Sequence, residues 1–114
     1  MVRSTEQVFQ DQVNAHLRGD FDAMVANYAD DAVLLAMDGA RVGKAAIEKY
    51  LIETLSALHD AKLTPTGHIV QGDYVLFTWT GESDTMTIPY GVDTFVIHDG
   101  KIQLETVWLT MIPK

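Results

Sequence analysis

The spacing of apolar residues changes once along this chain of 114 residues, and that change limits the folds it can adopt. In most of the first 58 residues, apolar side chains recur every three or four positions, as in amphipathic helices. After Asp60 the period becomes two, and runs of β-branched and aromatic residues are separated by short turn sequences. Helices followed by strands predict a segregated α+β fold rather than an alternating α/β fold.

Three helices are predicted in the first half. Ser4 followed by Gln7 is a capping-box signature that begins a helix over 4–18. Asp20 can cap a second, shorter helix ending near residue 30. The helical period returns from Gly43 to about residue 58, which predicts the third and longest helix.

A short hairpin is predicted between the second and third helices. Residues 32–37 form an apolar strand candidate, and Asp38-Gly39 is a turn signal that returns the chain through residues 40–42. We interpret the pairs Asp30-Asp31 and Asp20/Asp22 as helix-end and cap residues, because short acidic side chains suit both places.

Four long strands follow, joined by tight turns into an antiparallel meander. They span 62–71, 74–82, 85–98 and 101–111. A sheet of this size twists, and three helices are available to cover one face of it. We therefore expect a cone-like curved antiparallel sheet wrapped round three N-terminal helices, with an apolar cavity between them. Residues 88–91 contain Pro89 and predict a bend or bulge.

Composition excludes several classes of protein. The length fits one domain over residues 1–114. Sixteen acidic against 8 basic residues give a net charge of -8, which disfavours nucleic acid and anionic membrane surfaces as partners. The chain has no cysteine, and its first twelve residues lack an apolar run of signal-peptide length, so we expect a cytoplasmic protein.

Asp93 is the strongest candidate for chemistry. Period two places Asp93, Phe95 and Ile97 on one face of their strand, so this acid lies among apolar neighbours. If that face is concave, Asp93 is a candidate proton donor or base. The alternatives are a carboxylate satisfied by a nearby hydroxyl or amide, or one that is solvated at the end of its strand.

His16 and Gln12 lie on the inner side of the first helix, one turn apart. Either side chain is a candidate to orient a ligand oxygen in the cavity, and the alternative for His16 is a satisfied core or rim residue. The four histidines are His16, His59, His68 and His98, and their spacing matches no metal motif, so no metal is expected. No phosphate loop or dinucleotide fingerprint is present, and we expect no cofactor.

The predicted pocket wall is apolar and aromatic, which suits an apolar small molecule. Its predicted ligand-binding residues are Tyr28, Leu34, Ala36, Tyr50, Leu51, Phe77, Trp79, Tyr90, Phe95 and Trp108. The aromatic residues among them are equally suited to a core or an interface. Both faces of the last strand carry apolar side chains, so one face can cover the cavity and the other can form a homodimer through the sheet.

Three segments resemble the nuclear transport factor 2-like superfamily, in its ketosteroid isomerase-like and SnoaL-like branch. They are LRGDFDAMVANYADDAVLLA (17–36), VGKAAIEKYL (42–51) and GVDTFVIHDGKI (91–102). The resemblance covers essentially the whole chain. It implies a cone of curved sheet with three helices (a cystatin-like roll), usually dimeric.

The resemblance also implies functional positions. Asp93 matches an oxyanion-binding Asp of ketosteroid isomerases, whereas Ala36 stands at the position of their proton-shuttling Asp and Gln12 at that of their oxyanion-binding Tyr. Because an oxyanion hole without a base does not move a proton between carbons, steroid isomerisation of the family's kind is not expected. Asp38 is a substitute base only if it does not make the turn beside Gly39.

Three hypotheses follow for the function. The first is a cofactor-free isomerase, cyclase or dehydratase that acts on an apolar carbonyl or hydroxyl compound, with Asp93 as acid or base and His16 and Gln12 positioning an oxygen. The second is a non-catalytic binding module for an apolar ligand or a partner protein in a dimer. The third is a dimerising scaffold whose pocket has collapsed onto its aromatic residues.

Overall fold

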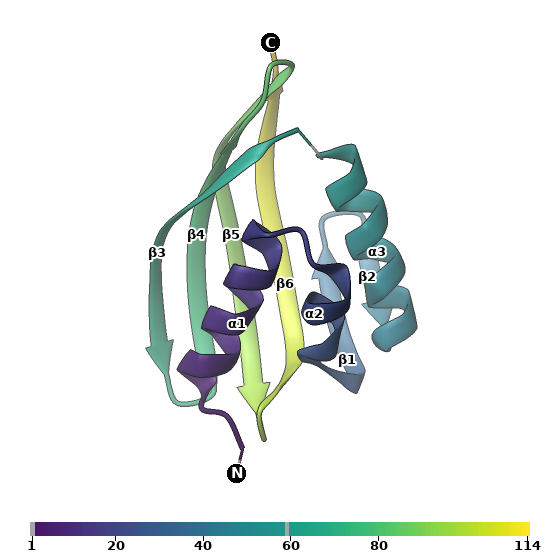
Figure 1. The fold of residues 1–114 in the computed structure, drawn as a ribbon, viewed down its shortest axis with the longest axis vertical. Helices are drawn as coiled ribbons and strands as arrows, with labels where there is room; N and C mark the ends of the chain where they lie inside the picture. Colours follow the sequence, from purple (N-terminus) through teal and green to yellow (C-terminus); the bar gives the residue numbers. More distant parts are fainter. Residues whose placement is uncertain (1, 59) are drawn as a thin grey trace.

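A computed structural model describes residues 2–58 and 60–114 of the protein (Figure 1). These described residues form three helices and six strands. In chain order they are α1 (Thr5–Leu17), α2 (Phe21–Ala26), β1 (Tyr28–Ala36), β2 (Gly39–Val42), α3 (Lys44–Ala57), β3 (Lys62–Gln71), β4 (Tyr74–Glu82), β5 (Met86–His98) and β6 (Lys101–Pro113). The α+β class, the third helix as the longest and the four-strand meander are confirmed.

The first two helices begin where their capping residues predict. The Ser4 hydroxyl accepts a hydrogen bond from the Gln7 backbone N–H at 3.1 Å, and the Asp20 carboxylate accepts one from the Ala23 N–H at 3.0 Å. Each bond satisfies an amide that has no partner inside its helix. Gly19, between the two helices, has a φ of +68°, a conformation in which glycine is unstrained.

The six strands form one mixed sheet in the order β2-β1-β6-β5-β4-β3. All neighbours are antiparallel except β1 and β6, which run parallel, with Val33 beside Leu104. That long-range pairing was not predicted, because only consecutive strands reveal their pairing through turns. The predicted bulge is confirmed, since the register between β5 and β6 shifts between Thr87 and Tyr90.

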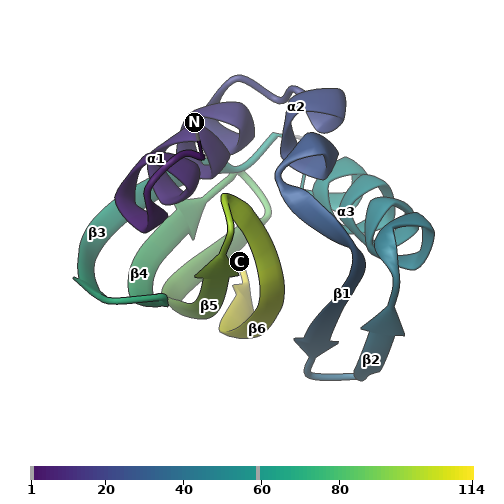
Figure 2. The ribbon, with the colours of Figure 1, turned by 90° about the horizontal axis from the view of Figure 1, so that it is seen from below.

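The sheet curves around the helices (Figure 2). Helix α1 contacts strands β3, β4 and β5, whereas α3 contacts β1 and β2. The three helices therefore lie on the concave side of the sheet, and none of the described residues forms a helix on the opposite, convex side (Figures 1 and 2). This arrangement is the cone that the sequence predicts.

The interpretation of Asp30-Asp31 as helix-end residues is wrong. Helix α2 ends at Ala26, and β1 begins at Tyr28, four residues earlier than predicted. The fully buried Tyr28 pairs with Ile102 of β6, and that tertiary pairing draws the segment into the sheet. A register shift between Tyr28 and Val33 leaves the two aspartates exposed. Local propensity gives way here to sheet pairing.

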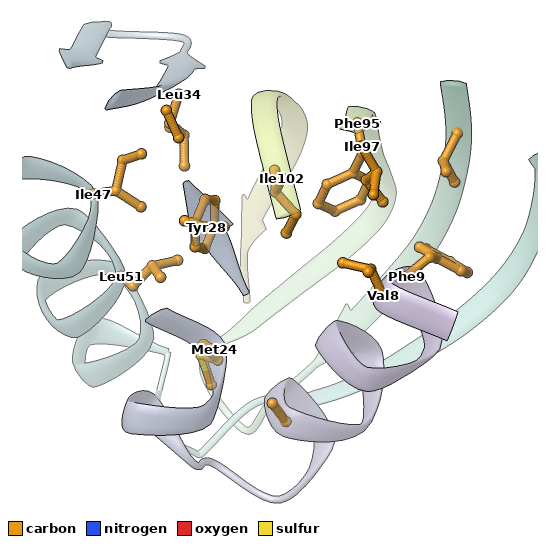
Figure 3. Close-up of a cluster of buried hydrophobic side chains, with 13 residues drawn as sticks. Val8, Phe9, Met24, Tyr28, Leu34, Ile47, Leu51, Phe95, Ile97 and Ile102 are labelled. Carbon is orange, nitrogen blue, oxygen red and sulfur yellow. The ribbon is translucent and has the colours of Figure 1, made fainter. Parts of the chain in front are cut away.

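The main core joins the helices to the concave face (Figure 3). Phe9 of α1 packs edge-on against Phe77 and Phe95, with ring centroids 5.1 and 6.0 Å apart, a geometry favoured by aromatic quadrupoles. Ile47 and Leu51 of α3 are buried on the other side of the core. Within the described ranges, no helix combines the length and the apolarity needed to cross a bilayer.

Candidate active site

A cavity of about 80 Å³ opens between the helices and the concave face of the sheet. Its walls come from α1, the α3 segment and strands β3 to β6. The lining residues are His16, Tyr50, Leu51, Thr54, Leu55, Leu58, Leu63, Trp79, Asp93, Glu105, Val107 and Leu109. Two carboxyl groups and one imidazole therefore share a mostly apolar hollow, the usual composition of a small-molecule site.

Asp93 faces inward from β5, as its strand parity predicts. Asp93 is only 9% exposed, and its Oδ1 accepts a hydrogen bond from the Trp79 indole Nε1 at 3.0 Å. Trp79 lies directly across from Gly91, where an added Cβ would come within 2.3 Å of the indole ring. Glycine at this position therefore lets the indole lie against the β5 backbone and reach Asp93.

Replacing Gly91 by alanine is expected to displace the Trp79 indole and to break its hydrogen bond to Asp93. The physical reason is the steric overlap between the new Cβ and three ring atoms, all within 2.6 Å. The measurement is the indole N–H resonance of Trp79 in a proton–nitrogen NMR spectrum, which is expected to shift upfield when the N–H loses its carboxyl acceptor. The matched control is Gly67→Ala, because the added Cβ would meet only the Thr78 hydroxyl, at 3.5 Å. An unshifted resonance in the Gly91 variant contradicts the packing argument.

Glu105 is the functional candidate that sequence reasoning missed. It lies on β6 opposite Phe95, two residues before Val107, which pairs with Asp93. The side chains of Glu105 and Asp93 line the same cavity. The Glu105 Oε1 also accepts a hydrogen bond from the Tyr28 hydroxyl. The sequence contains a signal that identifies Glu105, because Glu105 shares strand parity with Val107 and Leu109, which also face the cavity.

The environment of Glu105 favours its neutral form. Burial, followed by the hydrogen bond and the negative charge of Asp93, raises the pKa of Glu105 well above the ordinary glutamate range, and the Tyr28 hydrogen bond only partly opposes this. Burial together with Glu105 also raises the pKa of the Tyr28 phenol well above its usual value. Both shifts favour the protonated form, so the buried surroundings of Glu105 and Tyr28 favour retention of their protons.

Gln12 and His16 of α1 meet each other at the edge of the cavity. The Gln12 Nε2 lies 3.2 Å from the His16 Nε2 and 3.3 Å from the Tyr28 hydroxyl, and the Gln12 Oε1 accepts from the Asn27 Nδ2 at 2.8 Å. Burial lowers the pKa of His16, although the Asp93 charge opposes the shift. His16 lines the cavity, whereas Gln12 stands behind it with its amide engaged by protein groups.

A wider groove of about 520 Å³ lies beside the cavity. Its lining includes His16, Leu55, Leu58 and Leu63, which also line the cavity, so the two hollows adjoin. Arg18 and Lys62 lie along the groove. The groove falls within the size range of ligand pockets, whereas the inner cavity alone is smaller than the roughly 150 Å³ that holds a benzene molecule.

Across residues 2–58 and 60–114, no group of three or more His, Cys, Asp or Glu side chains is placed to hold a metal ion. His68 lies near Glu6 and His98 near Asp73, both away from the cavity lining. His59 lies outside the described residues.

A comparison with protein-family models decides the family. The model of the SnoaL-like domain matches residues 9–105, which is most of the chain and includes both cavity carboxyls. The chain belongs to the SnoaL-like domain family. None of the curated proteins matches its sequence.

Solved structures similar to this SnoaL-like protein share its fold at low sequence identity. A candidate polyketide cyclase from Sinorhizobium meliloti is 22% identical with a TM-score of 0.78, over 90% of this chain and 94% of the other. TerC, crystallised with polyporic acid, is 19% identical with a TM-score of 0.80, over 93% and 91% of the two chains. SalBIII, an epoxide hydrolase/cyclase-like enzyme in pyran ring formation in salinomycin, is 21% identical with a TM-score of 0.80, over 93% and 90%.

The structure brings seven of the thirteen sequence-predicted site residues of this SnoaL-like protein to the cavity or directly behind it. Those in the cavity wall are Asp93, His16, Trp79, Tyr50 and Leu51. Gln12 and Tyr28 contact wall residues from behind.

The other predicted positions lie elsewhere in the SnoaL-like fold. Leu34 and Phe95 are buried in the core, and Ala36 and Phe77 pack against it. Tyr90 and Trp108 are 57% and 64% exposed on the convex side, because their strand parity is opposite to that of Asp93 and Leu109. Asp38 makes the predicted turn and pairs with Arg41.

Proposed function

We propose that this protein is a cofactor-free isomerase, cyclase or dehydratase that binds a small apolar carbonyl or hydroxyl compound and uses Asp93 to transfer a proton. One observation supports this most directly: Asp93 is nearly buried in the wall of a cavity and is paired with a second carboxyl, Glu105. Two adjacent carboxyl groups in a hollow are costly for folding and are typical of functional sites.

The pair suits proton transfer. The surroundings of Glu105 favour its neutral form, so Glu105 suits the role of a hydrogen-bond donor. We assign to Asp93 the role of accepting a proton from a carbon beside a ligand carbonyl and later returning it. The Trp79 N–H holds the Asp93 carboxyl in one orientation. Positioned general acid–base groups of this kind accelerate reactions by about 10²–10⁴-fold.

The two hollows indicate the shape of the ligand. The inner cavity of about 80 Å³ accommodates the reacting end, and the adjoining groove accommodates the apolar remainder. Among the similar structures, TerC was crystallised with polyporic acid, and SalBIII acts in pyran ring formation. Both are compatible with an oxygen-bearing ring compound as the ligand of this chain.

The test uses 2-tetralone, a flat ketone with exchangeable hydrogens beside its carbonyl. In deuterated buffer, the protein is expected to accelerate loss of the α-proton signal in the proton NMR spectrum above the buffer rate. Exchange at the buffer rate, with ring signals that show binding, contradicts the enzyme and supports the binding-module alternative. One observation favours the binding-module alternative: Ala36, which cannot transfer a proton, stands at the position of the base in ketosteroid isomerases.

We also propose that the convex face of the sheet forms a homodimer. Tyr74, Leu76, Tyr90 and Trp108, from three adjacent strands, are exposed there, with Trp108 64% exposed. Exposed apolar side chains grouped in this way are typical of interfaces between subunits.

Replacing Trp108 by glutamate is expected to weaken dimerisation by at least about 30-fold, since a buried interface tryptophan commonly contributes about 2 kcal/mol or more. Sedimentation velocity over a range of concentrations measures the change. The matched control is Ile52→Glu, at an exposed apolar residue on α3, and it is expected to leave the association unchanged. A Trp108 variant that associates as wild type does, or a monomeric wild type, overturns the proposed interface.

A further inference from the structure

We propose that Arg3 and Asn27 act through Gln12 to hold His16 as the neutral tautomer with its proton on Nδ1, which makes His16 a hydrogen-bond donor to a ligand oxygen. The inference rests on the proposed function for the role of the ligand, but the tautomer itself is a property of the free protein. Arg3, Asn27 and Gln12 are then positioning residues that do not touch the ligand.

Hydrogen bonds link Arg3 to Asn27, Asn27 to Gln12, and Gln12 to His16. At the Arg3 end of this chain, only one assignment of donor and acceptor is possible. A guanidinium group donates and never accepts. The Arg3 Nη1 lies 2.8 Å from the Asn27 Oδ1 and 2.9 Å from the Asp11 Oδ2, and its Nη2 donates to the Gly100 carbonyl at 2.9 Å. Arg3 therefore determines which end of the Asn27 amide is oxygen, a choice that amide geometry alone leaves open.

The orientation of the Asn27 amide in turn determines the donor and acceptor roles of Gln12 and His16. With its oxygen on Arg3, the Asn27 Nδ2 donates to the Gln12 Oε1 at 2.8 Å. The Gln12 Nε2 is then the group that faces the His16 Nε2 at 3.2 Å and the Tyr28 hydroxyl at 3.3 Å. An amide nitrogen does not accept hydrogen bonds, so the His16 Nε2 must present a lone pair and the proton must sit on Nδ1.

Burial makes this arrangement difficult to reverse. Gln12 and Asn27 are 1% and 5% exposed, and water is not available to replace a mismatched amide contact. A protonated His16 would place an Nε2–H against the Gln12 N–H. The ionisable groups that share the hollows with His16 are Asp93, Glu105 and Tyr50 in the cavity and Arg18 and Lys62 in the groove. Consistently, burial lowers the pKa of His16.

The consequence for a ligand follows from the position of His16 in the walls of both hollows. A neutral Nδ1–H there can donate to a carbonyl or hydroxyl oxygen while Asp93, across the same cavity, exchanges a proton with carbon. A donor of this kind stabilises negative charge that develops on the ligand oxygen. The chain of hydrogen bonds thus separates the two roles, with His16 as donor and Asp93 as acceptor.

The test is the nitrogen-15 NMR spectrum of the imidazole of His16 in the ligand-free protein, in which a protonated and an unprotonated ring nitrogen have separate shifts. In the wild type, Nδ1 is expected to be protonated and Nε2 unprotonated. In Gln12→Glu a carboxylate that only accepts faces Nε2, so Nε2 is expected to gain a proton and the titration midpoint of His16 to rise by about one pH unit or more. In Arg3→Met the Asn27 amide loses its fixed direction, and a mixture of tautomers is expected.

Lys49→Met, which removes an exposed cation on α3 that lines neither hollow and lies near Glu53, is the matched control and leaves the tautomer unchanged. A wild-type His16 protonated on Nε2 overturns the inference. An Arg3→Met protein with the wild-type tautomer overturns the role of Arg3, and this outcome is available even if Gln12→Glu does not fold. Because no ligand is present, failure of the 2-tetralone exchange test leaves these results unaffected, so the two proposals are tested separately.

Discussion

Replacing Asp93 by asparagine is expected to lower protein-catalysed α-proton exchange of 2-tetralone by about 10²–10⁴-fold, the usual contribution of a general acid–base group. Asparagine keeps the shape of the side chain and an oxygen that can accept from the Trp79 indole, 3.0 Å away in the wild type. The melting temperature is therefore expected to change by only a few degrees, about the effect of 1 kcal/mol or less in a domain of this size. Loss of activity with retained stability separates a chemical role from a structural one.

The matched control is Asp73→Asn, in the turn between β3 and β4, where the carboxylate pairs with His98 away from the cavity lining. Its exchange rate is expected to equal that of wild type. An Asp93→Asn protein that exchanges 2-tetralone at the wild-type rate would remove Asp93 from the reaction. A variant that unfolds instead indicates that the carboxyl is a structural group.

Replacing Glu105 by alanine is expected to have the largest effect on stability of any single change at the site. It removes the acceptor of the buried Tyr28 hydroxyl and leaves a cavity, and together these cost about 3 kcal/mol or more of the free energy of unfolding. Glu105→Gln is the matched control, since its carbonyl still accepts from Tyr28 and its amide still donates toward Asp93. That variant is expected to lie within about 1 kcal/mol of wild type near pH 5. Urea denaturation measures both values.

The same pair of proteins tests the protonation of Glu105. Because the native pKa of Glu105 is raised, the folded protein keeps a proton that the unfolded chain releases above about pH 4.3. The wild-type free energy of unfolding therefore loses this contribution progressively as pH rises from the unfolded toward the native pKa. Glu105→Gln lacks that dependence, so its stability relative to wild type is expected to increase with pH across this window. A difference that is constant or that decreases with pH contradicts a neutral Glu105.

Local patterns in the sequence predict much of the fold and part of the site. Turn signals such as Asp99-Gly100, where both residues have positive φ, place the ends of the strands, and period two makes Asp93 face inward. The helix caps at Ser4 and Asp20 are likewise confirmed. Each of these features depends on residues within a few positions of one another. Physical rules of local geometry are sufficient for them.

Only the tertiary structure shows which face of the sheet lines the cavity and which face is exposed. Tyr90 and Trp108 are aromatic residues on strands, and composition alone does not say whether such a residue faces a cavity or a convex surface. Strand parity places them on the face opposite to Asp93, and the position of α1 on the concave side of the curved sheet makes that face the exposed, convex one (Figure 2). The same curvature places Val107 and Leu109 in the cavity wall.

By itself, the sequence determined the order of the helices and strands, the meander and the inward direction of Asp93, because helix periods, strand parity and turns act between near neighbours. Only the tertiary structure decided what surrounds that acid. The Tyr28–Glu105 contact spans 77 positions and the Arg3–Gly100 contact 97, and no local pattern encodes a partner at such a separation. The parallel pairing of β1 with β6 brings Tyr28 to the strand of Glu105, and the burial of Glu105 raises its pKa.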